Sequence, residues 1–307
     1  MFAYVIRRIA AAIPTLAVIV TIAFFMMRVA PGGPFDLDRA LTPEIEARIK
    51  AAYRLDQPLH RQYLAYVGDV LAGDFGPSFK SRDFTVAELM AAGFPASLRI
   101  GAAAIVLAIV CGMGLGTLAA LRHNTPADYA TMGLAMTGIT IPNFVMAPLL
   151  TLVFGVYLSL LPVAGWNDGA FRNLVLPVIV LALPQIAYIA RLTRGSMVEV
   201  LGANYIRTAR AKGMPERIVV VRHALKAAAL PVVSYLGPAT AGILTGSVVV
   251  ETIFDLPGMG RYFVQGALNR DYTLVMATVI VYAALIIVLN LIVDLLYGVL
   301  DPKVRHP

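Results

Sequence analysis

The chain has 307 residues, of which 59% are hydrophobic and 14% charged, with a formal net charge of +7 at pH 7 and a mean hydropathy of +0.77. Soluble domains carry about 25% charged residues, so this composition excludes a soluble globular protein and predicts an integral membrane protein. The single cysteine, Cys111, lies in an apolar run, so neither a disulfide within the chain nor a thiolate metal cluster is expected.

Six apolar runs are long enough to cross the hydrocarbon core of a bilayer, which takes about 20 helical residues. The first, residues 9–29, follows Arg7 and Arg8. A secretory signal peptide is the alternative for this segment, but its apolar core would span about 7 to 15 residues and end at a cleavage site of small residues. The other runs are residues 98–121, 131–161, 174–190 (interrupted by Pro177 and Pro184), 231–250 and 273–297. An all-α membrane protein with six transmembrane helices is predicted.

A polar insert separates the first two runs. Residues 1–30 hold the N-terminus and first span, residues 31–97 the insert, residues 98–300 the core of five spans, and residues 301–307 a tail. The insert is too long for a turn and too polar for lipid. Its apolar residues predict two short helices that form a small cap: Ile45, Ile49, Tyr53, Leu64, Tyr66, Val67, Val70 and Phe75.

Basic residues in the short loops fall on one side of the membrane. They precede the first span, follow the second and fourth, and follow the sixth at Lys303 and Arg305. Because Lys and Arg are enriched in cytoplasmic loops, both termini are expected in the cytoplasm.

The segment between the fourth and fifth spans, residues 191–230, carries eight Arg or Lys and two Glu, a net charge of +6. Apolar residues near 3.6 spacing predict a helix from Ser196 to Gly213, with Gly213 and Pro215 as stop signals. A second helix is predicted from Ile218 to Leu230. This polar segment is suited either to docking on a cytoplasmic protein or to lying on anionic lipid.

Enzyme and ion-carrier motifs are missing from the sequence. The four histidines are isolated, and neither a phosphate-binding loop nor a nucleophile elbow is present. Ion-driven carriers place acidic or basic relays inside their spans, whereas here Glu251 and Asp294 lie near span ends. These absences favour a transporter driven by ATP that other proteins hydrolyse. An ion-driven carrier or channel, and a membrane-embedded enzyme or assembly factor, are the alternatives.

The residues of the basic segment resemble a known family. RTARAKG at residues 207–213, followed by RHAL at 222–225 and Leu230-Pro231, is similar to the cytoplasmic "EAA" loop of binding-protein-dependent ABC importer permeases. Arg207 and Thr208 stand where the general pattern has Glu and Ala. The form seen here resembles the B-type membrane subunit of oligopeptide and dipeptide permeases, and residues 7–35, 55–79 and 251–275 are similar to further segments of that branch.

The resemblance implies a type I ABC importer permease fold in a bacterial inner membrane. It implies partners: a second, C-type six-span subunit, two cytoplasmic ABC ATPases, an extracytoplasmic peptide-binding protein that the insert would contact, and membrane lipid. Neither cofactor nor metal would be bound by this chain, and ATP and Mg would be held by the ATPases. The substrate would be oligopeptides, with dipeptides, nickel chelates or glycans as alternatives within the branch.

The resemblance also assigns roles to residues. The coupling helix that receives motion from the ATPases would end at Gly213, where a left-handed conformation would disfavour Val or Pro. Independently of the resemblance, the four-residue spacing of the glycine pairs 112/116 and 242/246 would allow close helix packing. The polar residues Asn143, Gln185, Thr245 and Asn290 are candidates for lining the translocation path. The coupling residues would be Val198, Glu199, Leu201, Asn204, Tyr205, Arg207, Thr208, Ala209, Arg210, Ala211, Lys212 and Gly213.

Overall fold

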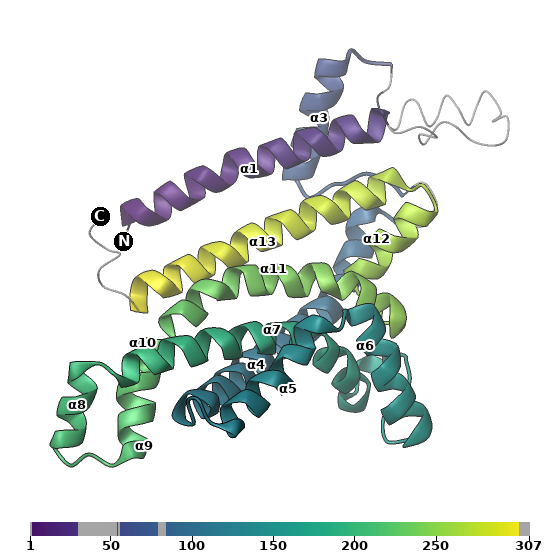
Figure 1. Cartoon of the computed structure of the whole chain (residues 1–307). Coiled ribbons are helices and arrows are strands. Elements are labelled where there is room, and N and C mark those ends of the chain that lie inside the picture. The colour runs from purple at the N-terminus through teal and green to yellow at the C-terminus, as the bar shows by residue number, and fades with distance from the viewer. Residues whose placement is uncertain (1, 30–53, 55, 79–83, 301–307) are drawn as a thin grey trace.

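The computed structural model describes residues 2–29, 54, 56–78 and 84–300. Within these ranges every regular element is a helix, apart from one isolated β-bridge between Pro77 and Thr85. The long helices lie side by side as an elongated bundle (Figure 1). Neighbours in contact run in the order α1, α13, α11, α7, α4, with α5 also against α7. Their bounds are α1 Phe2–Val29, α4 Val86–Leu121, α5 Pro126–Thr140, α7 Phe171–Leu201, α11 Leu230–Ile253 and α13 Tyr272–Leu300.

Five of these helices, α1, α4, α7, α11 and α13, are long and apolar enough to cross a membrane. A sixth span is made by α5 together with α6 (Asn143–Leu150) and the π-helical turn η1 (Thr151–Tyr157), which meet at an angle of 107°. The prediction of six apolar spans is confirmed on this count. The prediction of one uninterrupted third span over residues 131–161 was wrong.

Pro142 explains the break in the third span. The residue before a proline is pushed out of the helical region, and Ile141 has the extended angles φ −99° and ψ 116°. Pro142 is also extended and precedes the first residue of α6, Asn143. An apolar run can therefore continue through a point at which the helix cannot.

The second span begins earlier than its apolar run. α4 starts at Val86 rather than Leu98, because Thr85 and Glu88 form a capping box. The Glu88 N–H donates to Thr85 Oγ1 at 3.2 Å, and the Thr85 N–H donates to Glu88 Oε2 at 2.7 Å. These bonds satisfy two backbone donors at the start of the helix. The expected insert of residues 31–97 therefore ends inside a long helix.

The fourth span is likewise longer than its apolar run of residues 174–190. α7 continues to Leu201 and passes Pro177 and Pro184 without losing its helical assignment. Arg191 therefore lies within the helix, three turns before its end. A single rod thus joins the membrane-spanning part of the chain to the basic segment.

Two ends of the bundle can be distinguished. The first turn of α1 and the last turn of α13 lie at the end that also carries α8 and α9, and α12 (Met259–Leu268) lies at the opposite end (Figure 1). We call these the α8 end and the α12 end.

The described part of the insert packs on the α12 end of α1. α3 (Leu59–Leu71) places the Tyr63 hydroxyl 2.7 Å from Thr21 Oγ1, and the ring of Tyr63 meets Phe24 edge to face at 5.2 Å between centroids. One of the two predicted insert helices is therefore present. The other, with Ile45, Ile49 and Tyr53, falls outside the described residues.

Small residues bring α4 and α5 against α7. A Cβ added to Gly112 would lie 2.7 Å from Ile189 Cβ, and one added to Gly116 would overlap the carbonyl oxygen of Ala190. A Cβ on Gly138 of α5 would overlap the carbonyl oxygen of Leu183. The predicted close approach through Gly112 and Gly116 is thus confirmed within this chain, and it makes α4, α5 and α7 one tightly packed unit.

Gly116→Ala is expected to destabilise this unit by about 1–3 kcal/mol, because two helix backbones must separate to admit the methyl group. Gly114→Ala is the matched control, since a Cβ there meets nothing within 4 Å. Thermal unfolding of the detergent-solubilised protein should show a lower midpoint for Gly116→Ala and an unchanged or higher one for Gly114→Ala. Equal midpoints would contradict the close packing.

Candidate functional site

The basic segment forms a compact helical hairpin at the α8 end of the bundle. α7 ends at Leu201, and α8 (Asn204–Ala211) follows after Gly202 and Ala203. The chain then returns through α9 (Glu216–Ile218), the π-helical turn η3 (Val219–Ala224) and α10 (Leu225–Ala228), which leads directly into α11. This hairpin therefore connects two membrane-spanning helices, α7 and α11.

The predicted helix from Ser196 to Gly213 was wrong as a single element. Glycine is disfavoured in helix interiors by about 1 kcal/mol relative to Ala. α7 ends at Leu201 with Gly202 as its C-cap, and Ala203 then takes an extended conformation. Val198, Glu199 and Leu201 belong to the last turns of α7, while the other predicted coupling residues belong to α8 or its C-terminal turn. The second predicted helix is confirmed in place, since helical turns run from Glu216 into α11 with π-helical geometry in the middle.

α8 has a buried face and an exposed face. Ile206 and Ala209 pack in an apolar cluster with Val219, Val220 and Ala224 of the returning arm, and Met197 of α7 joins the same cluster. The side chains left exposed are those of Asn204, Tyr205, Arg207, Thr208, Arg210, Ala211 and Lys212. The returning arm of the hairpin thus packs against the buried face of α8. The opposite face of α8 is polar, cationic and exposed.

The turn after α8 depends on a left-handed residue. Gly213 has φ +75°, its N–H donates to the carbonyl oxygen of Arg210 at 2.9 Å, and the N–H of Met214 donates to that of Ala209 at 3.4 Å. Glycine adopts this conformation without a Cβ penalty. The expectation of a left-handed Gly213 is confirmed.

An ion pair closes the hairpin across this turn. Arg210 Nη2 donates to Glu216 Oε1 at 2.6 Å, and Nε donates to Oε2 at 3.1 Å. This hydrogen bonding lowers the pKa of Glu216 and raises that of Arg210, so both are charged at neutral pH. Neither Arg207 nor Lys212 has a carboxylate partner among the described ion pairs. They supply the uncompensated positive charge of α8.

The four predicted path residues lie on four different helices. Gln185 of α7 is buried and accepts a 2.8 Å hydrogen bond from the Tyr235 hydroxyl of α11. Asn290 of α13 lies over Gly237 of α11, where an added Cβ would overlap its Oδ1 atom. Asn143 begins α6 and is partly exposed. Thr245 lies in α11, and its side chain is outside the described part. The described contacts join Gln185 and Asn290 to α11 rather than to each other.

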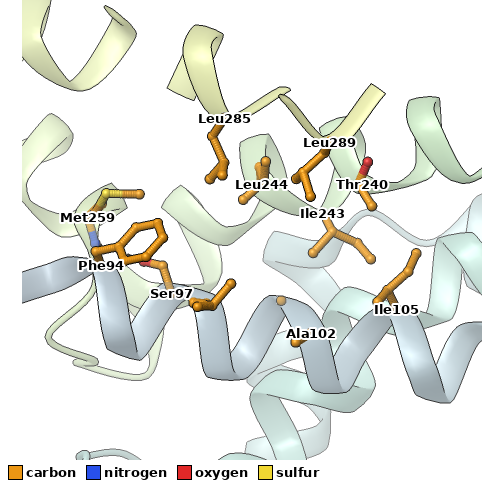
Figure 2. Close-up of a pocket in the computed structure, with 12 residues that line it drawn as sticks. Phe94, Ser97, Ala102, Ile105, Thr240, Ile243, Leu244, Met259, Leu285 and Leu289 are labelled. Carbon is orange, nitrogen blue, oxygen red and sulfur yellow. Dashed lines mark hydrogen bonds between the residues drawn. The ribbon is translucent and has the colours of Figure 1, made fainter. Parts of the chain in front are cut away.

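An apolar cavity of about 160 Å³ lies between α4, α11, α12 and α13. Figure 2 shows Phe94 and Ile105 of α4 facing Ile243 of α11 and Leu285 of α13, with Met259 of α12 at one end. Its lining residues come from segments nearly 200 positions apart in the chain. Sequence patterns did not predict this cavity, because each lining residue reads locally as an ordinary apolar helix position.

A buried carboxylate bonded to Ser97, one of the residues that line this cavity, joins three helices. Glu251 of α11 is 0% exposed; it accepts 2.6 Å and 2.7 Å hydrogen bonds from Ser97 Oγ of α4 and the Gly260 N–H of α12. The Met259 N–H in turn donates to Ser97 Oγ at 2.9 Å. An added Cβ on Gly258 would overlap the carboxylate, so the glycines at the start of α12 make room for it. The carboxylate is therefore an N-terminal anchor for α12.

Comparison with known proteins decides the family. Residues 112–306 match the family model described as the inner membrane component of binding-protein-dependent transport systems, and residues 1–100 match the model of its N-terminal region. The chain belongs to this family. The resemblance drawn from RTARAKG and the other segments is thereby confirmed, and the protein is a multi-pass inner-membrane permease component.

Similar proteins cover the whole length of this permease. It is 56% identical over 306 residues to the oligopeptide transport system permease protein OppB of Salmonella typhimurium, with 100% of each chain covered. It is 46% identical over 305 residues to the dipeptide transport system permease protein DppB of Bacillus subtilis, with 99% of this chain and 98% of that one covered.

A solved structure shows the same fold. A chain of the methionine ABC transporter MetNI, in inward-facing conformations, matches with a TM-score of 0.60 and 15% identity, covering 70% of this permease and 97% of the MetNI chain. The predicted type I ABC importer permease fold is confirmed on this likeness and the family match.

Proposed function

We propose that this permease is a transmembrane subunit of an ATP-driven importer of peptides, with oligopeptides as the main substrate. The observation that carries the proposal is the 56% identity over the full length to an oligopeptide permease, against 46% to a dipeptide permease. The chain contributes a path through the membrane, and the energy comes from ATP hydrolysed by other subunits.

The proposed complex holds a second six-span permease subunit of the C type, two cytoplasmic ABC ATPases that bind ATP and Mg, and an extracytoplasmic peptide-binding protein. The α8 end faces the cytoplasm, because its hairpin holds most of the chain's net positive charge. The α12 end and the insert then face the binding protein. Both termini lie in the cytoplasm in this arrangement.

The coupling site in this proposal is the exposed face of α8. Ile206 and Ala209 fix α8 to the returning arm, so a displacement of α8 moves α7 and α11 with it. Tyr205 is 49% exposed and offers an aromatic contact, and Arg207 and Lys212 favour a groove on the ATPase that presents carboxylates. Val198, Glu199 and Leu201 contribute from the end of α7.

Disulfide crosslinking tests the docking face. The natural thiol is first removed with Cys111→Ser, and single cysteines are then introduced by Tyr205→Cys or, as the matched control, Ile206→Cys. Tyr205→Cys should crosslink to cysteines placed in the ATPase, with a yield that changes on ATP binding, whereas the buried Ile206→Cys should not. Equal yields from both positions would contradict the assignment of the faces.

In this proposal Asn143, Gln185, Thr245 and Asn290 contribute polar groups to the translocation path. Partly exposed Asn143 and Asn290 offer their amides to peptide bonds directly. Gln185 is engaged by Tyr235 and becomes accessible when α7 and α11 separate.

Affinity purification in a gentle detergent tests the assembly. The permease should copurify with a second six-span subunit and with ATPases that carry phosphate-binding loops. Adding a peptide-loaded binding protein should raise the ATPase rate of the complex. Recovery of this chain alone, with no associated ATPase, would contradict the proposal and favour a carrier that works by itself.

A further inference from the structure

An ion pair between a buried carboxylate and a partly exposed arginine near the α8 end is unused by the site described so far. Asp128, in the first turn of α5, receives a hydrogen bond from Arg194 of α7 on each carboxylate oxygen, from Nε at 2.6 Å and from Nη2 at 2.6 Å. The backbone N–H of Asn124 donates to the same carboxylate at 2.9 Å, and His123 Nδ1 lies 3.6 Å away. The side chain of Asp128 is 1% exposed. This is a two-point contact of fixed geometry.

The pair joins two parts of the chain with different roles. Arg194 lies in α7 between the membrane-spanning part and the start of α8 at Asn204, and α7 is uninterrupted up to Leu201. Asp128 begins α5, which leads through the bend at Pro142 into α6. Because α7 is one rod and α8 follows it within two residues, a push on α8 reaches Arg194 directly.

α5 and α7 are in extensive contact, and the ion pair adds a polar attachment to this packing. Gly138 brings α5 against Leu183 of α7 at the end of α5 that is distant from Asp128, and such apolar packing is less directional than a charged hydrogen bond. The Asp128–Arg194 bonds add a second, directional attachment near the start of α5. With two attachments α5 must follow α7 as a rigid body.

We propose that Asp128 and Arg194 are positioning residues for transport, which transmit the displacement of α8 through α7 to the broken span formed by α5 and α6. The inference rests on the proposed function, since it requires ATPases that move α8. Without the pair, α7 moves with α8 while α5 and α6 lag behind. ATP is then hydrolysed with little peptide moved.

Two conservative variants and their combination test this inference. Asp128→Asn keeps the size of the side chain and the acceptor for Asn124, and Arg194→Gln removes the charged fork. The complete complex is reconstituted in proteoliposomes with its binding protein and peptide, and three quantities are measured: ATPase subunits bound per permease, ATP hydrolysed, and peptide imported per ATP hydrolysed.

Each single variant should assemble normally and hydrolyse ATP within about twofold of the natural complex, but import on the order of tenfold less peptide per ATP. The double variant should lose no more than either single variant, because both act through one contact. Gly114→Ala is the control, since an added Cβ on this exposed α4 residue meets nothing within 4 Å and should leave the ratio unchanged.

Two results would overturn the inference. One is a ratio of peptide to ATP in Asp128→Asn equal to that of the natural complex. The other is a loss of assembled complex with an unchanged ratio in what remains, which would make the pair purely structural. Failure of the proposed function can be told apart from failure of this inference. If the proposed function were wrong, the natural complex itself would show no ATPase response to a peptide-loaded binding protein.

Discussion

Replacing Glu251 by Ala is expected to lower the stability of the protein by about 2–5 kcal/mol, because it leaves at least two buried donors without their acceptor, each costing about 1–3 kcal/mol. These donors are Ser97 Oγ–H of α4 and the Gly260 N–H of α12. α12 also loses the carboxylate that complements its N-terminus. Thermal unfolding of the purified complex should show a midpoint lower by about 3–8 °C.

Matched variants separate this network from a general loss of charge. Glu251→Gln retains an acceptor of nearly the same shape and should fall between the natural protein and Glu251→Ala. Glu199→Ala removes an exposed carboxylate and should change stability by less than about 0.5 kcal/mol. A Glu251→Ala protein with the natural unfolding midpoint would refute the role of the carboxylate in holding α4, α11 and α12 together.

Gly213→Val is expected to reduce peptide uptake at least about tenfold while the protein still inserts in the membrane. A β-branched residue strongly disfavours positive φ, and the left-handed conformation costs non-glycine residues roughly 1–2 kcal/mol. An added Cβ would meet nothing within 4 Å, so the cost comes from the backbone and not from a clash. The turn should rearrange and displace α8 from its packing on the returning arm. Uptake of labelled peptide, normalised to inserted protein, measures the effect.

Gly213→Asn is the matched variant, because Asn visits the left-handed region more readily than other residues and should keep most of the uptake. Gly195→Val is a second control: Gly195 is exposed in α7, has no positive φ and meets no neighbour. Normal uptake by a well-inserted Gly213→Val complex would show that the shape of this turn is not needed for coupling.

The spans could be predicted from sequence because hydrophobic length is a local property. α1, α7, α11 and α13 each contain the apolar run assigned to them, and α4 extends its run only at the start, where Thr85 and Glu88 set the boundary. The break at Pro142 lies inside a continuous apolar run, so the hydropathy of the sequence does not reveal it. The local rule for the residue before proline would have indicated it.

The candidate site was predicted in part. The position of the basic segment and the conformation of Gly213 follow from local signals, whereas the division of the predicted helix at Gly202 combines the low helix propensity of glycine with the packing of α8 against η3. Glu251 and Ser97 are 154 residues apart in the chain, and Arg194 and Asp128 are 66 apart. Such pairings are set by tertiary packing and leave no mark on the pattern around either residue.

Transport by the reconstituted complex tests the central claim most directly. The permease, its partner subunit and ATPases are placed in proteoliposomes, and entry of a labelled oligopeptide is followed with ATP, with a non-hydrolysable ATP analogue, and with an ion gradient alone. We predict uptake that requires both ATP hydrolysis and the binding protein. Uptake by this chain alone under an ion gradient, without ATPases, would contradict the account.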